Sequence, residues 1–291
     1  MRGRSLRLGA ALLINITLTG GLLFAGHAAN SSGLTADAGH NLTDAMAIGL
    51  ALIAEIIALK PASERRSFGN QRMTILAALL NGVVLVAVTV SIGWFAIDRL
   101  IHPQPVHGGI VVVAASLSII ANLVVVWLLV SDHEDLNIRA TLLHAGGDVL
   151  GSAVVAVSGL IIMISHGPIA QRIDPVASLI VAGFIVVEAI KVTASSLHIL
   201  LEGVPTDLDV DEVRQRLTDL DGISEIHDLH VWSLSSSHRA LSAHAVLSDN
   251  PSVSATSALL EQARALLKRE FRIDHSTIEL EAKPCESPAH E

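Results

Sequence analysis

Long apolar runs alternate with short polar segments along the chain up to about residue 201. A helix needs about 20 apolar residues to cross the hydrocarbon core of a bilayer. The runs are close to that length, and they cover residues 8–26, 39–59, 75–97, 110–130, 142–164 and 175–201. The pattern therefore predicts six transmembrane helices. The first run is preceded by arginines and ends near "AGHAA", as a secretory signal would, but it is longer than the apolar region of such a signal.

The pattern changes after Gly203, where the sequence becomes polar and acidic. Helical spacing appears in residues 210–220 and 254–271, and strand-like alternation in residues 225–234, 239–247 and 276–282. The link "SSSH" between the first two of these strands has the length of a hairpin loop. We therefore expect a transmembrane domain over residues 1–204 and a small α+β domain over residues 205–291, with Pro205 at the boundary.

Composition and charge agree with a membrane protein. Hydrophobic residues make up 51% of the 291 positions and charged residues 16%, which is too apolar for an ordinary soluble domain. The single cysteine, Cys285, excludes an intrachain disulfide framework and a site built from several thiolates. Basic residues favour one side of the predicted spans, which places both termini in the cytoplasm. That side carries Arg2, Arg4, Arg7, Lys60, Arg65, Arg66, Arg72 and Arg139, and the other carries Arg99 and Arg172.

Two apolar runs contain the same polar spacing, His-x-x-x-Asp. The first copy is His40 with Asp44 in "HNLTDAMAIGL", and the second is His144 with Asp148 in "HAGGDVLGS". Residues four apart lie on one helix face, and an aspartate at mid-bilayer costs roughly 3 kcal/mol unless it faces the bundle interior. One such pair can simply hydrogen-bond across helices. The repeat favours a metal site instead, since two imidazoles and two carboxylates suit tetrahedral zinc and neutralise its charge.

The quoted motifs extend to a family resemblance. The segments "GLTADAGHNLTDAMAIGLAL", "LAALLNG", "LHAGGDVLGS", "DPVASLIVAGFIVV", "ILLEGVP" and "IHDLHVWSLSSSHRALSAHAVL" resemble the successive signatures of the cation diffusion facilitator family, and the match covers nearly the whole chain. The resemblance implies a homodimer with six transmembrane helices and a cytosolic ferredoxin-like domain in each protomer. It also implies a zinc exporter, with Co²⁺ or Cd²⁺ as further cargo, in a bacterial inner membrane. The transport site would be His40, Asp44, His144 and Asp148.

The chain departs from its apparent relatives in some places. Where many of them carry an aromatic residue and a glutamate, this chain has Asn70 and Thr74. The loop "KPASERRSFGNQR" contains no histidine, which argues against the second metal site that some relatives carry there. The loop "SDHEDLNIR" contains only His133, so we expect no histidine-rich metal buffer in it.

Further candidate residues lie outside the four proposed ligands. Asp37 is one turn before His40, where it would either line an outer vestibule or be a solvated carboxylate at the start of a helix. In the tail, His227, His244 and His275 align with positions that bind regulatory zinc in some relatives. Strand alternation predicts that His227 and His230 point to opposite faces and do not share a metal.

The main functional hypothesis is exchange of cytoplasmic zinc for protons. When the cation leaves, two desolvated carboxylates remain, and protonation of the site restores the charge balance. An intramembrane metal-dependent hydrolase would need an open coordination position, and a passive channel would need weaker sites. We expect no enzymatic activity, no prosthetic group and no nucleic-acid partner.

Overall fold

The computed structural model describes residues 2–130, 138–165, 167, 169–249 and 252–284, except for the side chains of residues 2–12, 128–130 and 138–145. It contains two compact units, Met1–Leu52 with Ala78–Thr193, and Ile53–Ala77 with Ala194–Glu291. His133, Cys285 and the side chain of His144 lie outside the described part, so the expectations that rest on them remain predictions.

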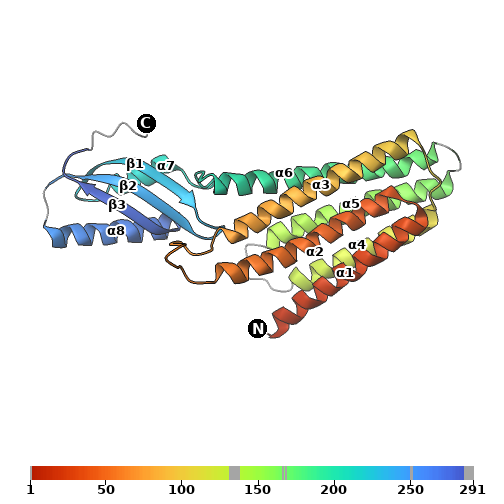
Figure 1. Ribbon diagram of the computed structural model, residues 1–291, viewed down its shortest axis with the longest axis horizontal. Coiled ribbons are helices and arrows are strands. Elements are labelled where there is room, and N and C mark those ends of the chain that lie inside the picture. The colour runs from red at the N-terminus through yellow and green to blue at the C-terminus, as the bar shows by residue number, and fades with distance from the viewer. Residues whose placement is uncertain (1, 131–137, 166, 168, 250–251, 285–291) are drawn as a thin grey trace. The chain divides into compact units, whose positions relative to one another are not determined.

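Long apolar helices dominate the N-terminal part of the chain (Figure 1). They are α1 (Arg2–Ala29), α2 (Ser32–Ala58), α3 (Met73–Ile101), α4 (Gly108–Val130), α5 (Ile138–Ile164) and α6 (Ile173–Leu200). Among the described residues, α2 to α6 are long and apolar enough to cross a membrane, and α1 contributes the shorter apolar stretch Leu13–Ala29. The prediction of a helical membrane domain is confirmed.

Asp174, the second residue of α6, holds the start of α2 in place. Its carboxylate is fully buried. Oδ2 accepts hydrogen bonds from the backbone N–H of Ser32 at 2.6 Å and from the Ser32 hydroxyl at 2.7 Å, and Oδ1 accepts one from the Ser31 hydroxyl. The first N–H groups of a helix have no partner within the helix, and they favour a negative charge beside them. Gly33 permits this approach, because an added Cβ would lie 3.1 Å from Asp174 Oδ1.

Small residues allow the membrane helices to pack closely. Ala36 and Ala38 of α2 and Ala115 of α4 are fully buried in a shared apolar core. Between α4 and α5 the backbones almost touch, since a Cβ added at Gly108 would lie 2.5 Å from the carbonyl oxygen of Gly159. Such contacts are typical of membrane helix interfaces, where packing replaces the hydrophobic effect as the cause of association.

The C-terminal part of the chain is an α+β domain, as predicted. It contains α7 (Val210–Thr218), β1 (Ile223–Ser233), β2 (Arg239–Leu247), α8 (Val253–Phe271) and β3 (Ile273–Glu281). The strands lie in the order β1-β2-β3, with β1 and β2 antiparallel and β2 and β3 parallel. Because parallel strands need a long crossover, α8 connects β2 to β3.

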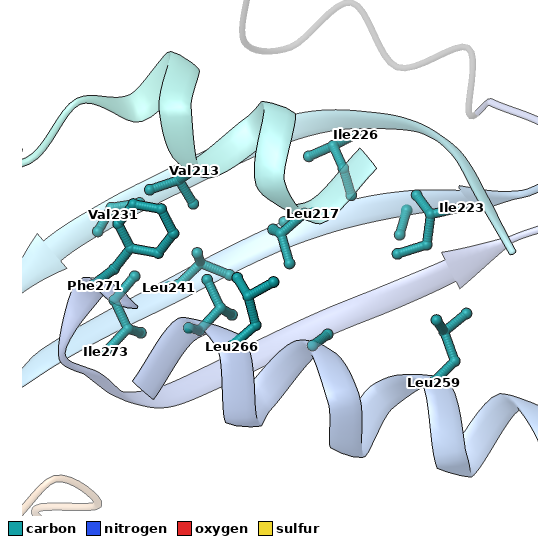
Figure 2. Close-up of a cluster of buried hydrophobic side chains, with 14 residues drawn as sticks. Val213, Leu217, Ile223, Ile226, Val231, Leu241, Leu259, Leu266, Phe271 and Ile273 are labelled. Atoms are coloured by element: carbon teal, nitrogen blue, oxygen red, sulfur yellow. The ribbon is translucent and has the colours of Figure 1, made fainter. Parts of the chain in front are cut away.

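Figure 2 shows the core of this domain on one face of the sheet, where apolar side chains of both helices meet those of the strands. The labelled residues are Val213, Leu217, Ile223, Ile226, Val231, Leu241, Leu259, Leu266, Phe271 and Ile273. An ion pair joins the segment before α7 to the sheet: Arg239 donates to both carboxylate oxygens of Asp207 at 2.7 Å. These hydrogen bonds lower the pKa of Asp207. The helices and the apolar core cover one face of the sheet, which leaves the opposite face for polar side chains.

Candidate metal centres

Helices α2 and α5 bring polar side chains together inside the membrane unit. His40 and Asp44 are one turn apart on α2, with His40 Nε2 at 3.7 Å from Asp44 Oδ2. Asp148 reaches the same imidazole from α5, with Oδ1 at 3.0 Å from His40 Nε2. One potential ligand atom from each of these residues lies within 4.8 Å of the other two. The arrangement therefore offers one nitrogen and two oxygen donors to a cation.

Burial makes this cluster costly without a positive charge. The side chains of His40, Asp44 and Asp148 are 9%, 19% and 13% exposed. Two carboxylates held this close repel each other, and desolvation increases the cost of their charges. A divalent cation would cancel both. His144, the fourth predicted ligand, precedes Asp148 by one turn in α5, but the structure does not describe its side chain.

Asp37 is part of a hydrogen-bonded network beside the cluster. It is 2% exposed, so the expectation of a solvated carboxylate is wrong. The physical reason is that α2 begins at Ser32, well before the predicted apolar run, so Asp37 lies in an interior turn. The Ser152 hydroxyl donates to its Oδ2 at 3.0 Å, and the Asn41 amide donates to its Oδ1 at 3.4 Å. Ser118 of α4 lies 2.9 Å from Ser152, which links three helices.

A cavity of about 120 Å³ adjoins these residues. Asp37 and His40 line it from α2, Asp148 lines it from α5, and α6 adds a carboxylate that our sequence interpretation did not single out, Glu188. The signal was present in the sequence, because Glu188 interrupts the apolar run of α6. The remaining lining residues are Gly147, Leu150, Gly151, Val181, Phe184 and Ile185.

A second cluster of potential ligands lies on the sheet of the C-terminal domain. Glu281 of β3 lies between two histidines: its Oε2 is 3.0 Å from His227 Nε2, and its Oε1 is 3.0 Å from His244 Nδ1. The two imidazole rings are 5.2 Å apart between centroids. Potential ligand atoms of the three residues lie within 4.8 Å of one another, which is compatible with a metal ion between them.

The structure does not bring His275 to this cluster. Its position in β3 is opposite Ala240 of β2, whereas His244 is opposite Glu279. The ring of His275 instead contacts Phe68 edge-on, with centroids 5.2 Å apart. The resemblance implied a site of His227, His244 and His275. The structure brings the first two of these histidines together, and the third potential ligand beside them is Glu281.

A bulge in β1 changes the predicted alternation. His227 is opposite His244 and His230 is opposite Ser242, so one strand has an extra residue between these pairs. Asp228, within the bulge, has a positive φ of 47°. Because opposed residues share a face, His227 and His230 lie on the same face, and the prediction of opposite faces is wrong. His230 Nε2 lies 3.1 Å from Asp228 Oδ1, and His230 is not one of the three clustered residues.

Comparison with known families agrees with both parts of the structure. Residues 8–201 match the cation efflux transmembrane domain, and residues 205–283 match the cytoplasmic domain of cation efflux proteins. The chain belongs to the cation efflux family. The resemblance to cation diffusion facilitators is thereby confirmed, and this cation efflux protein is an integral membrane transporter rather than an enzyme.

Several characterised proteins are similar to this cation efflux protein. A cadmium, cobalt and zinc/H⁺-K⁺ antiporter of Bacillus subtilis is 37% identical over 94% of this chain and 88% of its own length. The zinc transporter ZitB of Escherichia coli is 35% identical over 90% and 83%, and the metal cation efflux system protein CzcD of Cupriavidus metallidurans is 34% identical over 95% and 87%. A solved metal-bound C-terminal domain of CzcD is 31% identical over 25% of this chain and 99% of that domain, with a TM-score of 0.23.

Proposed function

We propose that this protein exports Zn²⁺ from the cytoplasm in exchange for protons, with Co²⁺ and Cd²⁺ as further cargo. Family membership establishes cation transport, and the names of the relatives supply the metals and the proton exchange. The observation that carries the proposal is the convergence of His40, Asp44 and Asp148 from α2 and α5. Imidazole and carboxylate donors favour zinc over harder cations such as Ca²⁺.

In this proposal His40, Asp44, His144 and Asp148 form the transport site. The cation binds as cargo, and its two positive charges balance the two aspartates. When it leaves, protons take over that balance. Alternating access of the site to the two sides of the membrane converts this competition into exchange. A channel is disfavoured because four strong ligands would release a cation too slowly for passive conduction.

The organisation of the protein is part of the proposal. Residues 1–204 would form the transport domain and residues 205–291 the cytosolic domain, with both termini in the cytoplasm. Similarity to bacterial exporters supports a location in the inner membrane, and the cytoplasmic domain supports a homodimer. In the cytosolic domain we propose a regulatory zinc site formed by His227, His244 and Glu281, in place of a site that includes His275.

Zinc flux in reconstituted vesicles tests this function. Asp148→Ala should reduce the flux to the background of empty vesicles, because it removes a ligand and leaves the partner imidazole without its carboxylate. Asp98→Ala is a matched control and should preserve the flux. Asp98 is an exposed carboxylate near the end of α3, where its Oδ1 lies 3.2 Å from the exposed His102.

Two outcomes would contradict the proposal. Normal zinc flux in a folded Asp148→Ala protein would exclude Asp148 as a ligand. Wild-type flux that does not respond to an imposed pH gradient would exclude proton exchange and favour the channel.

A further inference from the structure

Helix α6 carries an acidic residue away from both of its ends. Glu188 lies well inside the helix Ile173–Leu200, which belongs to a span with a mean hydropathy of 2.1. An acidic side chain at such a position costs roughly 3 kcal/mol when lipid surrounds it, so such residues almost always face a cavity or the bundle interior and serve transport. This cost suggests that Glu188 has a function in the protein.

Glu188 shares one face of α6 with residues that line the cavity beside the proposed transport site. Val181, Phe184, Ile185 and Glu188 follow the spacing of one helix face, and all line the cavity that His40 also lines. Glu188 is an exposed residue of α6, and it lines the same cavity as the proposed transport ligands although it comes from a third helix.

The level of Glu188 along the helices indicates its side of the site. A short connection joins α5 to α6, which makes them antiparallel neighbours, and a Cβ added at Gly151 would lie 3.9 Å from Val181. Glu188 is seven residues beyond Val181, or about 10.5 Å along the axis. Moving the same distance back along α5 from Gly151 passes Asp148 and reaches residue 144. Residue 144 is His144, the proposed ligand of α5 that lies nearer to the start of that helix. Glu188 is therefore level with the edge of the site that faces the end of α6 leading into the cytoplasmic domain.

We infer that Glu188 captures the divalent cation on its way from the cytoplasm to the transport site; this inference rests on the proposed function. A hydrated cation can bind a carboxylate through its own water molecules before it exchanges them for protein ligands. A negative charge in a cavity with low-dielectric walls also raises the local cation concentration. Glu188 would therefore govern how readily zinc reaches the site, while Asp148 and its partners govern how it is held.

Steady-state zinc transport into inside-out vesicles tests this role, because it separates KM from kcat. Glu188→Gln keeps the size of the side chain and removes its charge. It should raise the KM for zinc by about tenfold, in line with the lower range of electrostatic focusing, and leave kcat within about twofold of wild type. The difference in KM should shrink at high ionic strength, which screens the attraction.

Three further variants serve as controls. Glu188→Asp keeps the charge and should restore a KM near that of wild type. Glu55→Gln makes the same chemical change at an exposed position of α2 that is outside the cavity lining, and should have no effect. Lys191→Gln removes the positive charge of the lysine three residues after Glu188 in α6. This variant should not raise the KM for zinc if Glu188 acts on zinc directly rather than through an ion pair with Lys191.

The outcomes separate this inference from the proposed function. A Glu188→Gln protein with the wild-type KM would overturn the inference alone. A variant that loses thermal stability and kcat without a change in KM would assign Glu188 a structural role and would also overturn it. Absence of zinc flux in the wild-type protein would overturn the proposed function, and the inference with it.

Discussion

Replacing Asp174 by asparagine tests how the start of α2 is fixed to α6. The change turns one carboxylate oxygen into an NH₂ group and removes the charge. The hydroxyls of Ser31 and Ser32 can rotate to accept a hydrogen bond from this group, but the backbone N–H of Ser32 can only donate. If the NH₂ group takes the place of Oδ2, it faces the Ser32 N–H; if it takes the place of Oδ1, it faces the Gly33 N–H, which lies 3.4 Å from that oxygen. Either orientation leaves a backbone donor opposite another donor.

The expected loss of stability follows from these contacts. A hydrogen bond to a charged group contributes about 1.5–3 kcal/mol, and a carboxylate at a helix N-terminus adds up to about 1 kcal/mol. Asp174→Asn should thus lower the free energy of unfolding by about 2–4 kcal/mol. Ser31→Ala removes one of the donors to Asp174 and should cost about 1 kcal/mol.

The measurement is reversible unfolding of the purified protein in detergent, followed by circular dichroism. Asp98→Asn provides the control: its carboxylate is 61% exposed, and an ion pair of this kind contributes about 0–1 kcal/mol. If Asp174→Asn were no less stable than Asp98→Asn, the anchoring of α2 by Asp174 would be refuted.

Two other predictions concern helix packing and the cytosolic site. Gly108→Ala should destabilise the protein by about 1–3 kcal/mol, because its Cβ would meet the α5 backbone. Gly109→Ala should be tolerated, since nothing lies within 4 Å of its Cβ. Unfolding of the two variants in detergent measures this difference in stability. In a chain that also carries Asp148→Ala, Glu281→Gln should weaken the remaining zinc binding by more than about tenfold and His275→Ala should not, as calorimetric titration would show. Equal losses would place His275 in the site.

The apolar pattern predicted the helical membrane domain well, because a bilayer forces each spanning segment to be long and apolar. It placed the start of α2 too late, at residue 39 rather than Ser32. The first turns of α2 contain Ser32 and Asp37, whose polar groups are satisfied by partners from α5 and α6. Hydropathy cannot register such partners, since they come from segments more than 100 residues away.

The candidate sites show a similar limit. The His-x-x-x-Asp repeat identified residues of α2 and α5 that the structure brings together, because helix periodicity fixes which side chains share a face. Glu281 had no such local signal. Its place beside His227 and His244 depends on the parallel register of β2 and β3, and on a bulge at Asp228 that alternation does not predict. Register between distant strands is a tertiary property.

The cluster on the sheet takes one residue from each of the described strands: His227 from β1, His244 from β2 and Glu281 from β3. In this sheet β1 and β3 are the outer strands, and outer strands are usually the first to fray in local unfolding. An ion held by all three residues would clamp both edges to the centre, so either edge could open only after the ion had left. Binding of cytoplasmic zinc should then slow amide hydrogen exchange in all of the strands. The strands would no longer fray one at a time, and the sheet would open only as a unit after the ion had dissociated.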